Sequence, residues 1–304
     1  MKMLVAGGTG FLGRELCAAL VRGGHGVRVV SRSVDGARRV LPAGTEVVAL
    51  PGTAAGWTAA VEGCEAIINL AGEPIAAGRW SEARKEAILA SRVGTTQALV
   101  EGCAGASARP TTLINGSAIG YYGDRGDETV NEASAPGHGF LARVCVEWEA
   151  AASGAEKLGM RVVRLRIGVV LGEGGGALQR MVVPFKAFLG GPLGTGRQWL
   201  SWIHRDDVIG LVQLALNDQG VHGALNLTAP DPRTMRDFSA ALGRAMHRPS
   251  WAPVPGFVLR LAMGEMADMI LGGQRVLPAV AEKVGYRFRY PKLEDALGAV
   301  LAAA

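Results

Sequence analysis

The sequence predicts an α/β protein in which a doubly wound parallel sheet carries a smaller lobe toward the C-terminus. Three observations support this prediction. Short apolar segments alternate with helical patterns through the first half of the chain, and a glycine-rich turn joins the first apolar segment to the first helix. After Gly168 this alternation gives way to glycine-rich loops and proline-containing segments. A chain of 304 residues is long enough for a core domain with such a lobe.

The apolar segments predict strands at residues 3–6, 26–30, 46–50, 66–70, 112–115 and 161–166. Nearly continuous apolar strands separated by helices are typical of a parallel sheet that is covered on both faces. Right-handed crossovers arrange such a sheet as a Rossmann fold, whose ligands bind at the carboxyl ends of the strands. We therefore expect a Rossmann domain over residues 1–168, with residues of about 206–228 added to it.

The remaining residues, 169–205 and 229–304, are expected to form the smaller lobe, which would bind the substrate. Loops and short helices should dominate there, because glycines are dense at 172–176 and 190–196 and prolines interrupt the later segment. Such a region is not expected to extend the sheet. We expect it to close over the carboxyl ends of the strands, where α/β proteins bind small molecules.

The glycine-rich turn predicts a dinucleotide site. Residues 7–13, with the sequence GGTGFLG, directly follow the first strand and begin an amphipathic helix over residues 11–22. Glycines let the backbone turn tightly and approach a pyrophosphate, whose charge is stabilised by the free N–H groups at a helix N-terminus. The alternative is a tight strand-to-helix turn that binds no ligand.

The end of the second strand predicts NADP(H) in preference to NAD(H). An Asp or Glu normally follows this strand and binds the adenosine ribose of NAD, but the chain has Ser31, Arg32 and Ser33 there. A guanidinium flanked by hydroxyls suits a 2′-phosphate. The alternative is that Arg32 is a solvated loop residue.

Composition and charge exclude several other classes. The net charge is +5, but the 32 Lys and Arg residues are scattered, so no nucleic-acid partner is expected. Cys17, Cys64, Cys103 and Cys145 form no CxxC pair, so neither a metal site nor a disulfide is indicated. With no signal-peptide core and no long apolar segment, we expect a cytoplasmic monomer or homodimer that does not bind membranes.

Together with the segment 69–72 after the fourth strand and Ser117 after the fifth, these motifs resemble the extended short-chain dehydrogenases/reductases of the epimerase/dehydratase group. The resemblance covers the whole chain. More narrowly, the chain is similar to an atypical subgroup whose members are described as nucleoside-diphosphate-sugar-epimerase-like, and sometimes as cell-division-inhibitor-like. The segments that carry this narrower resemblance are 79–80, 91–93, 117–123, 194–204 and 285–291.

The resemblance implies a Tyr-x-x-x-Lys pair that moves the proton during hydride transfer, and this chain departs from it. When Glu149 is aligned with the acid on the family's catalytic helix, Leu141 takes the position of Tyr and Cys145 that of Lys. Arg92 replaces an Asn that is usual on an earlier helix, whereas Ser117 keeps the usual Ser. A standard epimerase mechanism is therefore not expected.

Tyr121 and Tyr122 are the candidates for the missing acid. Both follow Ser117 on the segment that leaves the fifth strand, where a phenol could reach the nicotinamide. A tyrosine can donate a proton if a cation stabilises its anion, and Arg92 is the cation that we nominate. The expected catalytic residues are thus Ser117, Tyr121, Tyr122 and Arg92. The alternative for the tyrosines is aromatic packing over the sheet.

Cys145, two aspartates and Arg197 are the remaining residues to which the sequence assigns a role. Cys145 is included by alignment only, since a thiol flanked by valines on a helix is expected to be packed rather than nucleophilic. Asp206 and Asp207 are expected to cap the helix that follows them. Arg197 could bind an anionic substrate or remain solvated.

The expected binding residues form two sets. The substrate residues are Arg197, Trp202 and His204, and the cofactor residues are Gly7, Thr9, Gly10, Phe11, Leu12, Gly13, Ser31, Arg32, Ser33, Leu70, Ala71, Gly72, Arg92, Ser117, Cys145 and Ile167.

Two functions are compatible with this sequence. The first is an NADP-dependent oxidoreductase or epimerase-like enzyme that acts on a small carbonyl or nucleotide-sugar-like substrate between the lobes. The second is a catalytically silent NADP(H) sensor, which Leu141 and Cys145 favour unless another residue replaces the missing pair. The fold alone supplies no substrate, so the substrate's identity stays open.

Overall fold

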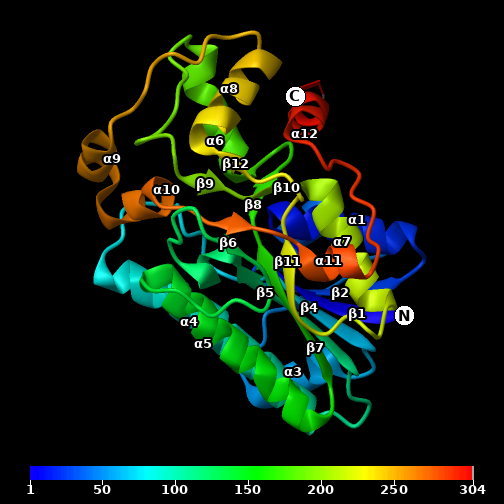
Figure 1. Ribbon diagram of the computed structural model, residues 1–304. Coiled ribbons are helices and arrows are strands. Elements are labelled where there is room, and N and C mark those ends of the chain that lie inside the picture. The colour runs from blue at the N-terminus through cyan, green and yellow to red at the C-terminus, as the bar shows by residue number, and fades with distance from the viewer. Residues whose placement is uncertain (303–304) are drawn as a thin grey trace.

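The computed structural model of the chain describes residues 1–302 and confirms the predicted α/β fold. A central sheet of seven parallel strands has the order β11-β7-β5-β4-β1-β2-β3 (Figure 1). Its strands are β1 (Lys2–Ala6), β2 (Gly26–Ser31), β3 (Glu46–Ala49), β4 (Ala66–Asn69), β5 (Thr112–Ala118), β7 (Arg161–Ile167) and β11 (Gly223–Leu227).

Helices cover both faces of this sheet, and their apolar stripes form two cores. One core packs α1 (Phe11–Arg22), α2 (Val34–Val40), α7 (Arg205–Asn217) and α11 (Ala279–Lys283) against the sheet. The other packs α3 (Ala54–Val61), α4 (Glu82–Gly105) and α5 (Phe140–Ser153), of which α4 and α5 lie side by side in Figure 1. In α1, for example, Leu16 and Leu20 are four residues apart and therefore share the buried face.

The smaller lobe has its own core, formed by α6 (Gly176–Lys186), α8 (Met235–Ala245) and α12 (Leu293–Ala302). These helices gather at the top of Figure 1. Three two-stranded ladders connect the parts of the molecule: β8 (Val169–Leu171) with β10 (Trp202–His204), β9 (Trp199–Leu200) with β12 (Arg233–Thr234), and β6 (Thr129–Val130) with β13 (Arg275–Val276). The remaining elements are the 3-10 helices η1 (Ile119–Tyr122), η2 (Gly154–Leu158) and η3 (Gly264–Ala267), and the helices α9 (Gly256–Met263) and α10 (Asp268–Leu271).

The six predicted strands and the first helix are confirmed, and the sheet has one strand more than was predicted. This strand, β11, lies within residues 206–228, which were expected to belong to the Rossmann domain, and it pairs in parallel with β7 from Gly223–Val163 to Leu227–Ile167. This edge strand begins with a glycine and contains a buried Asn226, so it lacks the continuous apolar pattern of the inner strands. Helices α8 and α12 are also longer than the short helices that were expected.

The boundaries between the Rossmann domain and the substrate lobe stay a prediction. The core of the smaller lobe draws its fully buried residues from 171–185, from Trp202 and from 229–300, whereas Ala281 packs on the core of the main sheet. Within residues 1–302, no helix is both long and apolar enough to cross a membrane.

Candidate functional site

The turn between β1 and α1 needs glycine at two positions for folding alone. Gly7 has a φ of +80°, and a Cβ atom added there would lie 2.7 Å from the backbone carbonyl carbon of Leu70. At Gly13 an added Cβ atom would lie 2.1 Å from the carbonyl oxygen of Gly7. These two glycines let β1, α1 and the loop after β4 approach one another, and so place Leu70 and Ala71 against the turn.

Gly10 differs from both, because a side chain there would point into open space. Its φ is −75°, and an added Cβ atom would have only the carbonyl oxygen of Gly7 nearby, at 3.3 Å. Gly10 is the N-cap of α1, and no side chain caps this helix, so within residues 1–302 its first N–H groups have no acceptor. Thr9, Phe11 and Leu12 flank this space in the chain. An uncapped helix N-terminus beside open space fits an anion such as a pyrophosphate.

The end of β2 presents a cation to solvent. The side chain of Arg32 is 82% exposed, and it forms an ion pair with the Glu73 carboxylate at 3.4 Å. Ser33 caps α2 by accepting a hydrogen bond from Gly36 N at 3.2 Å, and Ser31 Oγ donates to Ser33 O at 3.0 Å. The serines therefore shape the loop, while the guanidinium of Arg32 is accessible to a phosphate.

Arg92 braces the loop that follows β4. Its Nη1 donates hydrogen bonds to the carbonyl oxygens of Glu73 at 3.0 Å and Ile88 at 3.1 Å. The guanidinium also lies over the ring of Trp148, with 5.2 Å between its central carbon and the ring centre. A Cβ atom added to Gly72 would be 3.0 Å from that same carbon, so the loop packs directly on the arginine. Burial lowers the pKa of Arg92 from its ordinary value.

A buried polar network lies under the carboxyl ends of β5 and β7. Arg166 forms a bidentate pair with Glu149, with Nε–Oε1 at 2.8 Å and Nη2–Oε2 at 2.9 Å. Ser117 Oγ donates to Glu149 Oε1 at 2.7 Å. Burial is the largest single influence and opposes the charge of Arg166, but the hydrogen bonds that it donates to Glu149 and Tyr122, together with the charges of these two groups, raise the pKa of Arg166. Ser117 is only 3% exposed, so the structure uses its hydroxyl proton inside this network rather than offering it to a substrate.

The same network encloses Tyr122, which is fully buried. Its hydroxyl donates to Asn226 Oδ1 at 2.7 Å and accepts a hydrogen bond from Arg166 Nη1 at 3.0 Å. Burial raises the pKa of Tyr122 to about 12, although Arg166 acts in the opposite direction. A hydroxyl with both partners inside the protein is not free to exchange a proton with a ligand.

Tyr121 is placed differently from its neighbour. It is only partly buried, and its hydroxyl forms no hydrogen bond with any other part of residues 1–302. The guanidinium carbon of Arg166 lies 3.4 Å from the ring centre. The cation on this tyrosine is thus Arg166, which the sequence interpretation missed, and not the nominated Arg92. The available signal was an arginine in a largely buried strand, β7, because a buried guanidinium requires a buried acid as its partner.

The segment η1, which contains Tyr121, packs on the helix α5 that carries Leu141 and Cys145. A Cβ atom added to Gly120 would lie 3.3 Å from Leu141 Cβ and 3.8 Å from Cys145 Sγ, so η1 packs on this face of α5. The Cys145 thiol is buried, which raises its pKa to about 11, and it is therefore not a thiolate at neutral pH. Ile167 lies at the end of β7 and is half-buried.

Two of the expected substrate residues belong to the interior of the fold. Trp202 is fully buried in the core of the smaller lobe, and its Nε1 donates to Asp231 O at 2.7 Å. His204 is also buried, and its Nδ1 accepts a hydrogen bond from Asp206 N at 3.1 Å. The indole N–H of Trp202 and the Nδ1 atom of His204 are thus hydrogen-bonded within the protein. Arg197, in contrast, is exposed, as an anion-binding residue must be.

The prediction that Asp206 or Asp207 caps α7 was wrong. His204, not Asp206 or Asp207, is the N-cap of α7, which begins three residues earlier than expected, at Arg205. Asp207 instead accepts backbone hydrogen bonds from Arg289 N at 2.7 Å and Tyr290 N at 3.0 Å. Its carboxylate therefore fixes the C-terminal segment against α7, a tertiary role that no local pattern indicates.

We expect Glu149→Gln to destabilise the protein by about 3 kcal/mol, because it leaves the buried Arg166 charge without its carboxylate partner. Urea unfolding measures this change. Glu147→Gln is the matched control, since Glu147 lies on the same helix and forms an exposed pair with Arg143 at 3.6 Å. That variant should change stability by less than about 1 kcal/mol. Equal effects of the two variants would contradict a structural role for the network.

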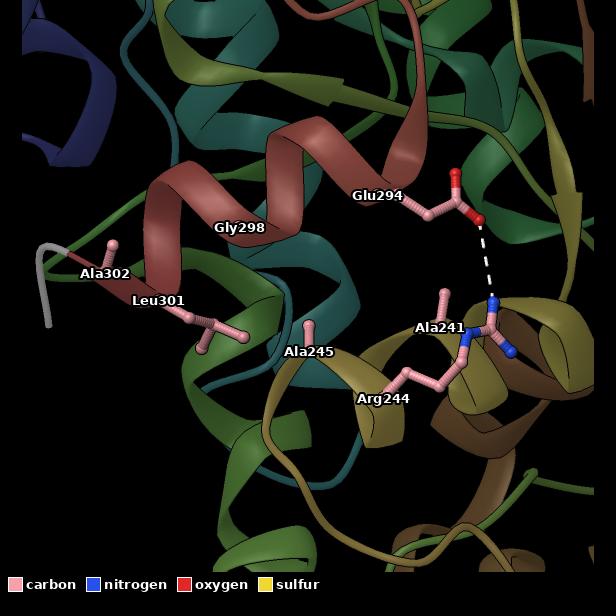
Figure 2. Close-up of a pocket in the computed structure, with 7 residues that line it drawn as sticks. All are labelled: Ala241, Arg244, Ala245, Glu294, Gly298, Leu301 and Ala302. Atoms are coloured by element: carbon pink, nitrogen blue, oxygen red, sulfur yellow. Dashed lines mark ion pairs between the residues drawn. The ribbon is translucent and has the colours of Figure 1, made fainter.

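A separate hollow of about 450 Å³ lies in the smaller lobe, between α8 and α12 (Figure 2). Small aliphatic side chains line most of it, and the Arg244–Glu294 ion pair, 3.6 Å long, closes one side. None of the described residues that line it is a nucleophile, and its guanidinium, that of Arg244, is paired with Glu294. Within residues 1–302, no cluster of three His, Cys, Asp or Glu side chains is arranged to hold a metal ion.

Comparisons with known proteins agree with this arrangement. The sequence profile of the NAD dependent epimerase/dehydratase family matches residues 3–227, and a domain of unknown function, DUF1731, matches residues 254–300. The chain is 42% identical over 303 residues to the "Epimerase family protein SDR39U1 homolog, chloroplastic" of Arabidopsis thaliana, covering 99% of this chain and 87% of that protein. It is 41% identical over 303 residues to the epimerase family protein YfhF of Bacillus subtilis, covering 99% of this chain and 98% of the relative.

A solved structure is similar over its full length. The crystal structure of human epimerase family protein SDR39U1 (isoform 2), determined with NADPH, has a TM-score of 0.88 to this chain and 34% identity. The similarity covers 100% of both chains. This relative therefore shares the whole architecture, including the smaller lobe, and it was crystallised with NADPH.

Proposed function

Because the chain belongs to the NAD-dependent epimerase/dehydratase family, and within it to an atypical group of short-chain dehydrogenases/reductases, we propose that it binds NADPH and reduces a small carbonyl compound. The observation that carries this proposal is the uncapped N-terminus of α1 beside the open space at Gly10, with exposed Arg32 at the end of the next strand. The first feature suits a pyrophosphate and the second a 2′-phosphate. The NADPH in the human relative supports the same choice.

Each expected residue has a distinct part in this proposal. Gly7 and Gly13 form the turn, Gly10 leaves room for the pyrophosphate, and the N–H groups at Phe11 and Leu12 would hold it. The segment from Leu70 to Gly72, supported by Arg92, forms the wall beside the turn. When bound, NADPH would supply a hydride. The substrate would enter between the sheet and the smaller lobe, with Arg197 exposed to meet an anionic group.

Tyr121 is the residue that we propose as proton donor to the substrate oxygen. Its hydroxyl has no protein partner within residues 1–302, and the Arg166 guanidinium on its ring favours the anion that remains after donation. Arg166 is itself fixed by Glu149, so the cation does not move when the proton leaves. In this arrangement Ser117 holds Glu149, the partner of Arg166, and Tyr122 binds Arg166 directly. Both residues would therefore position Arg166 and would not touch the substrate.

Fluorescence titration with NADPH, followed by consumption of NADPH with a panel of small carbonyl compounds, tests this proposal. We expect saturable binding and turnover with at least one member. Absence of NADPH binding would overturn the cofactor assignment. The cytoplasmic location and the monomeric or dimeric state stay predictions that fractionation and sedimentation can address.

We expect Arg32→Ala to weaken NADPH binding about ten- to a hundredfold, since a charge-assisted hydrogen bond to the phosphate contributes roughly 1.5 to 3 kcal/mol. NADH affinity should stay within about twofold, because NADH has no 2′-phosphate. Arg38→Ala is the control, as that side chain is also exposed and pairs with Asp35 at 3.7 Å on α2. If both cofactors weakened equally in Arg32→Ala, the variant would report loop damage instead of phosphate recognition.

An NADPH sensor without turnover is the second candidate. The observations that favour it are Leu141 and Cys145 in place of the catalytic pair, and the enclosure of Ser117 and Tyr122 in the buried network. A sensor would bind NADPH with the same Arg32 dependence but would show no burst or turnover with any carbonyl compound. In that case Tyr121→Phe would leave every measurable property of the protein almost unchanged.

A further inference from the structure

The carboxylate of Glu73 lies between two arginines from different elements. Its Oε1 is 3.4 Å from Arg32 Nη1 at the end of β2, and its Oε2 is 3.3 Å from Arg84 Nη1 on α4. Glu73 belongs to the loop after β4, and β4 and β2 flank β1 on opposite sides in the sheet. The guanidinium assigned to the 2′-phosphate therefore already has an anionic partner, which comes from a loop distant in sequence.

Glu73 is the anchored member of its pair with Arg32. Glu73 N donates to Ser91 Oγ at 3.0 Å, and Glu73 O accepts a hydrogen bond from Arg92 Nη1 at 3.0 Å. Its side chain is 30% exposed, whereas that of Arg32 is 82% exposed. Because α4 holds both the backbone and the carboxylate of Glu73, an arriving phosphate is more able to draw Arg32 away than to displace Glu73.

We propose that Glu73 is a counter-ion that sets the selectivity between NADPH and NADH, an inference that rests on the proposed binding of NADPH. A phosphate monoester carries about −1.5 to −2 charges at neutral pH, so it must compete with the carboxylate for Arg32 and is also repelled by it. NADH brings no such charge to this position. Glu73 therefore weakens the binding of NADPH but not that of NADH, and it narrows the difference in affinity between the two cofactors.

The test is Glu73→Gln, which keeps the size of the side chain and removes its charge. We expect NADPH and the adenosine-end probe 2′,5′-ADP to bind about three- to tenfold more tightly, and NADH affinity not to rise. The gain should shrink as salt is raised, since the removed repulsion is electrostatic. Calorimetric or fluorescence titration measures these affinities without any turnover.

Three further variants make the result specific. Glu82→Gln removes an acid of α4 that pairs with Lys85 at 3.0 Å, and it should leave all affinities within twofold. Glu73→Asp retains the charge but withdraws it by one methylene, so we expect an intermediate gain for NADPH. In an Arg32→Ala background, Glu73→Gln should raise NADPH affinity less than it does in the wild-type protein, because the competition for Arg32 is gone.

The failure of this inference can be distinguished from the failure of the proposed function. If the wild-type protein binds NADPH and Glu73→Gln leaves its affinity unchanged or weaker, the counter-ion role is overturned while NADPH binding stands. An equal gain for NADPH and NADH would also overturn it, since selectivity would be unaffected. If the wild-type protein binds neither NADPH nor 2′,5′-ADP, both the proposed cofactor site and the role of Glu73 are overturned.

Discussion

Replacement of Gly10 by Val is expected to abolish measurable NADPH binding while the protein stays folded. The backbone at this position, with a φ of −75°, accepts a side chain, and an added Cβ atom meets only the Gly7 carbonyl oxygen, at 3.3 Å. The valine would therefore project into the space that a pyrophosphate needs at the N-terminus of α1. Loss of two charge-assisted hydrogen bonds, at roughly 1.5 to 3 kcal/mol each, weakens binding by about 10²- to 10⁴-fold. Fluorescence titration measures the loss.

The control for this variant is Gly52→Val. Gly52 is exposed in the loop before α3, has open space around its Cα atom and lies outside the turn between β1 and α1. Both variants should melt within a few degrees of the wild-type protein, and only Gly10→Val should lose NADPH. Unaltered NADPH binding by a folded Gly10→Val protein would mean that the motif is a structural turn.

The parts of the site that sequence could predict are those formed by short, local segments. The turn at residues 7–13 is fixed by the order of strand, glycines and helix, and the absence of an acid at the end of β2 can be seen from Arg32 alone. The same holds for the inner strands of the sheet, whose apolar pattern is nearly continuous. Local conformation and the ligand's charge both follow from a few neighbouring residues, and so they can be inferred without the tertiary structure.

The polar network could not be predicted in the same way, because its members meet only through tertiary folding. Ser117, Glu149 and Arg166 come from β5, α5 and β7, and Tyr122 binds Asn226 from the edge strand. The sequence placed Ser117 and both tyrosines near the correct strand end. It could not show that the hydroxyls of Ser117 and Tyr122 are turned inward.

The same limit applies to Glu73 and Asp207. Each carboxylate acts on a segment that lies far away in the sequence, Arg32 in one case and the backbone at Arg289 and Tyr290 in the other. An acid in a loop or at the start of a helix has a local explanation, as a solvated charge or a helix cap, and the correct partner has no sequence signature. The partners of Glu73 and Asp207 could therefore be identified only from the structure.

Tyr121→Phe is expected to lower the rate of carbonyl reduction by about 10²- to 10⁴-fold and to leave NADPH affinity within about twofold. The variant removes only the hydroxyl, while the ring keeps its contact with the Arg166 guanidinium, 3.4 Å from the ring centre. The proposed pyrophosphate and 2′-phosphate sites lie on β1, α1 and β2, away from Tyr121, so we expect cofactor binding to be unaltered. Single-turnover rates and titrations on the same preparations measure both quantities.

Tyr122→Phe separates a proton donor from a structural tyrosine, because the two residues are neighbours with opposite surroundings. The hydroxyl of Tyr122 lies between Asn226 and Arg166, and burial raises the pKa of Tyr122 to about 12. Removal of this hydroxyl should therefore lower the stability of the protein by roughly 1 to 3 kcal/mol. The single-turnover rate should fall by less than about tenfold, since Arg166 keeps its bidentate pair with Glu149. A large loss of rate in Tyr122→Phe with normal turnover in Tyr121→Phe would reverse the assignment. Normal turnover in the double variant would instead leave the proton to water.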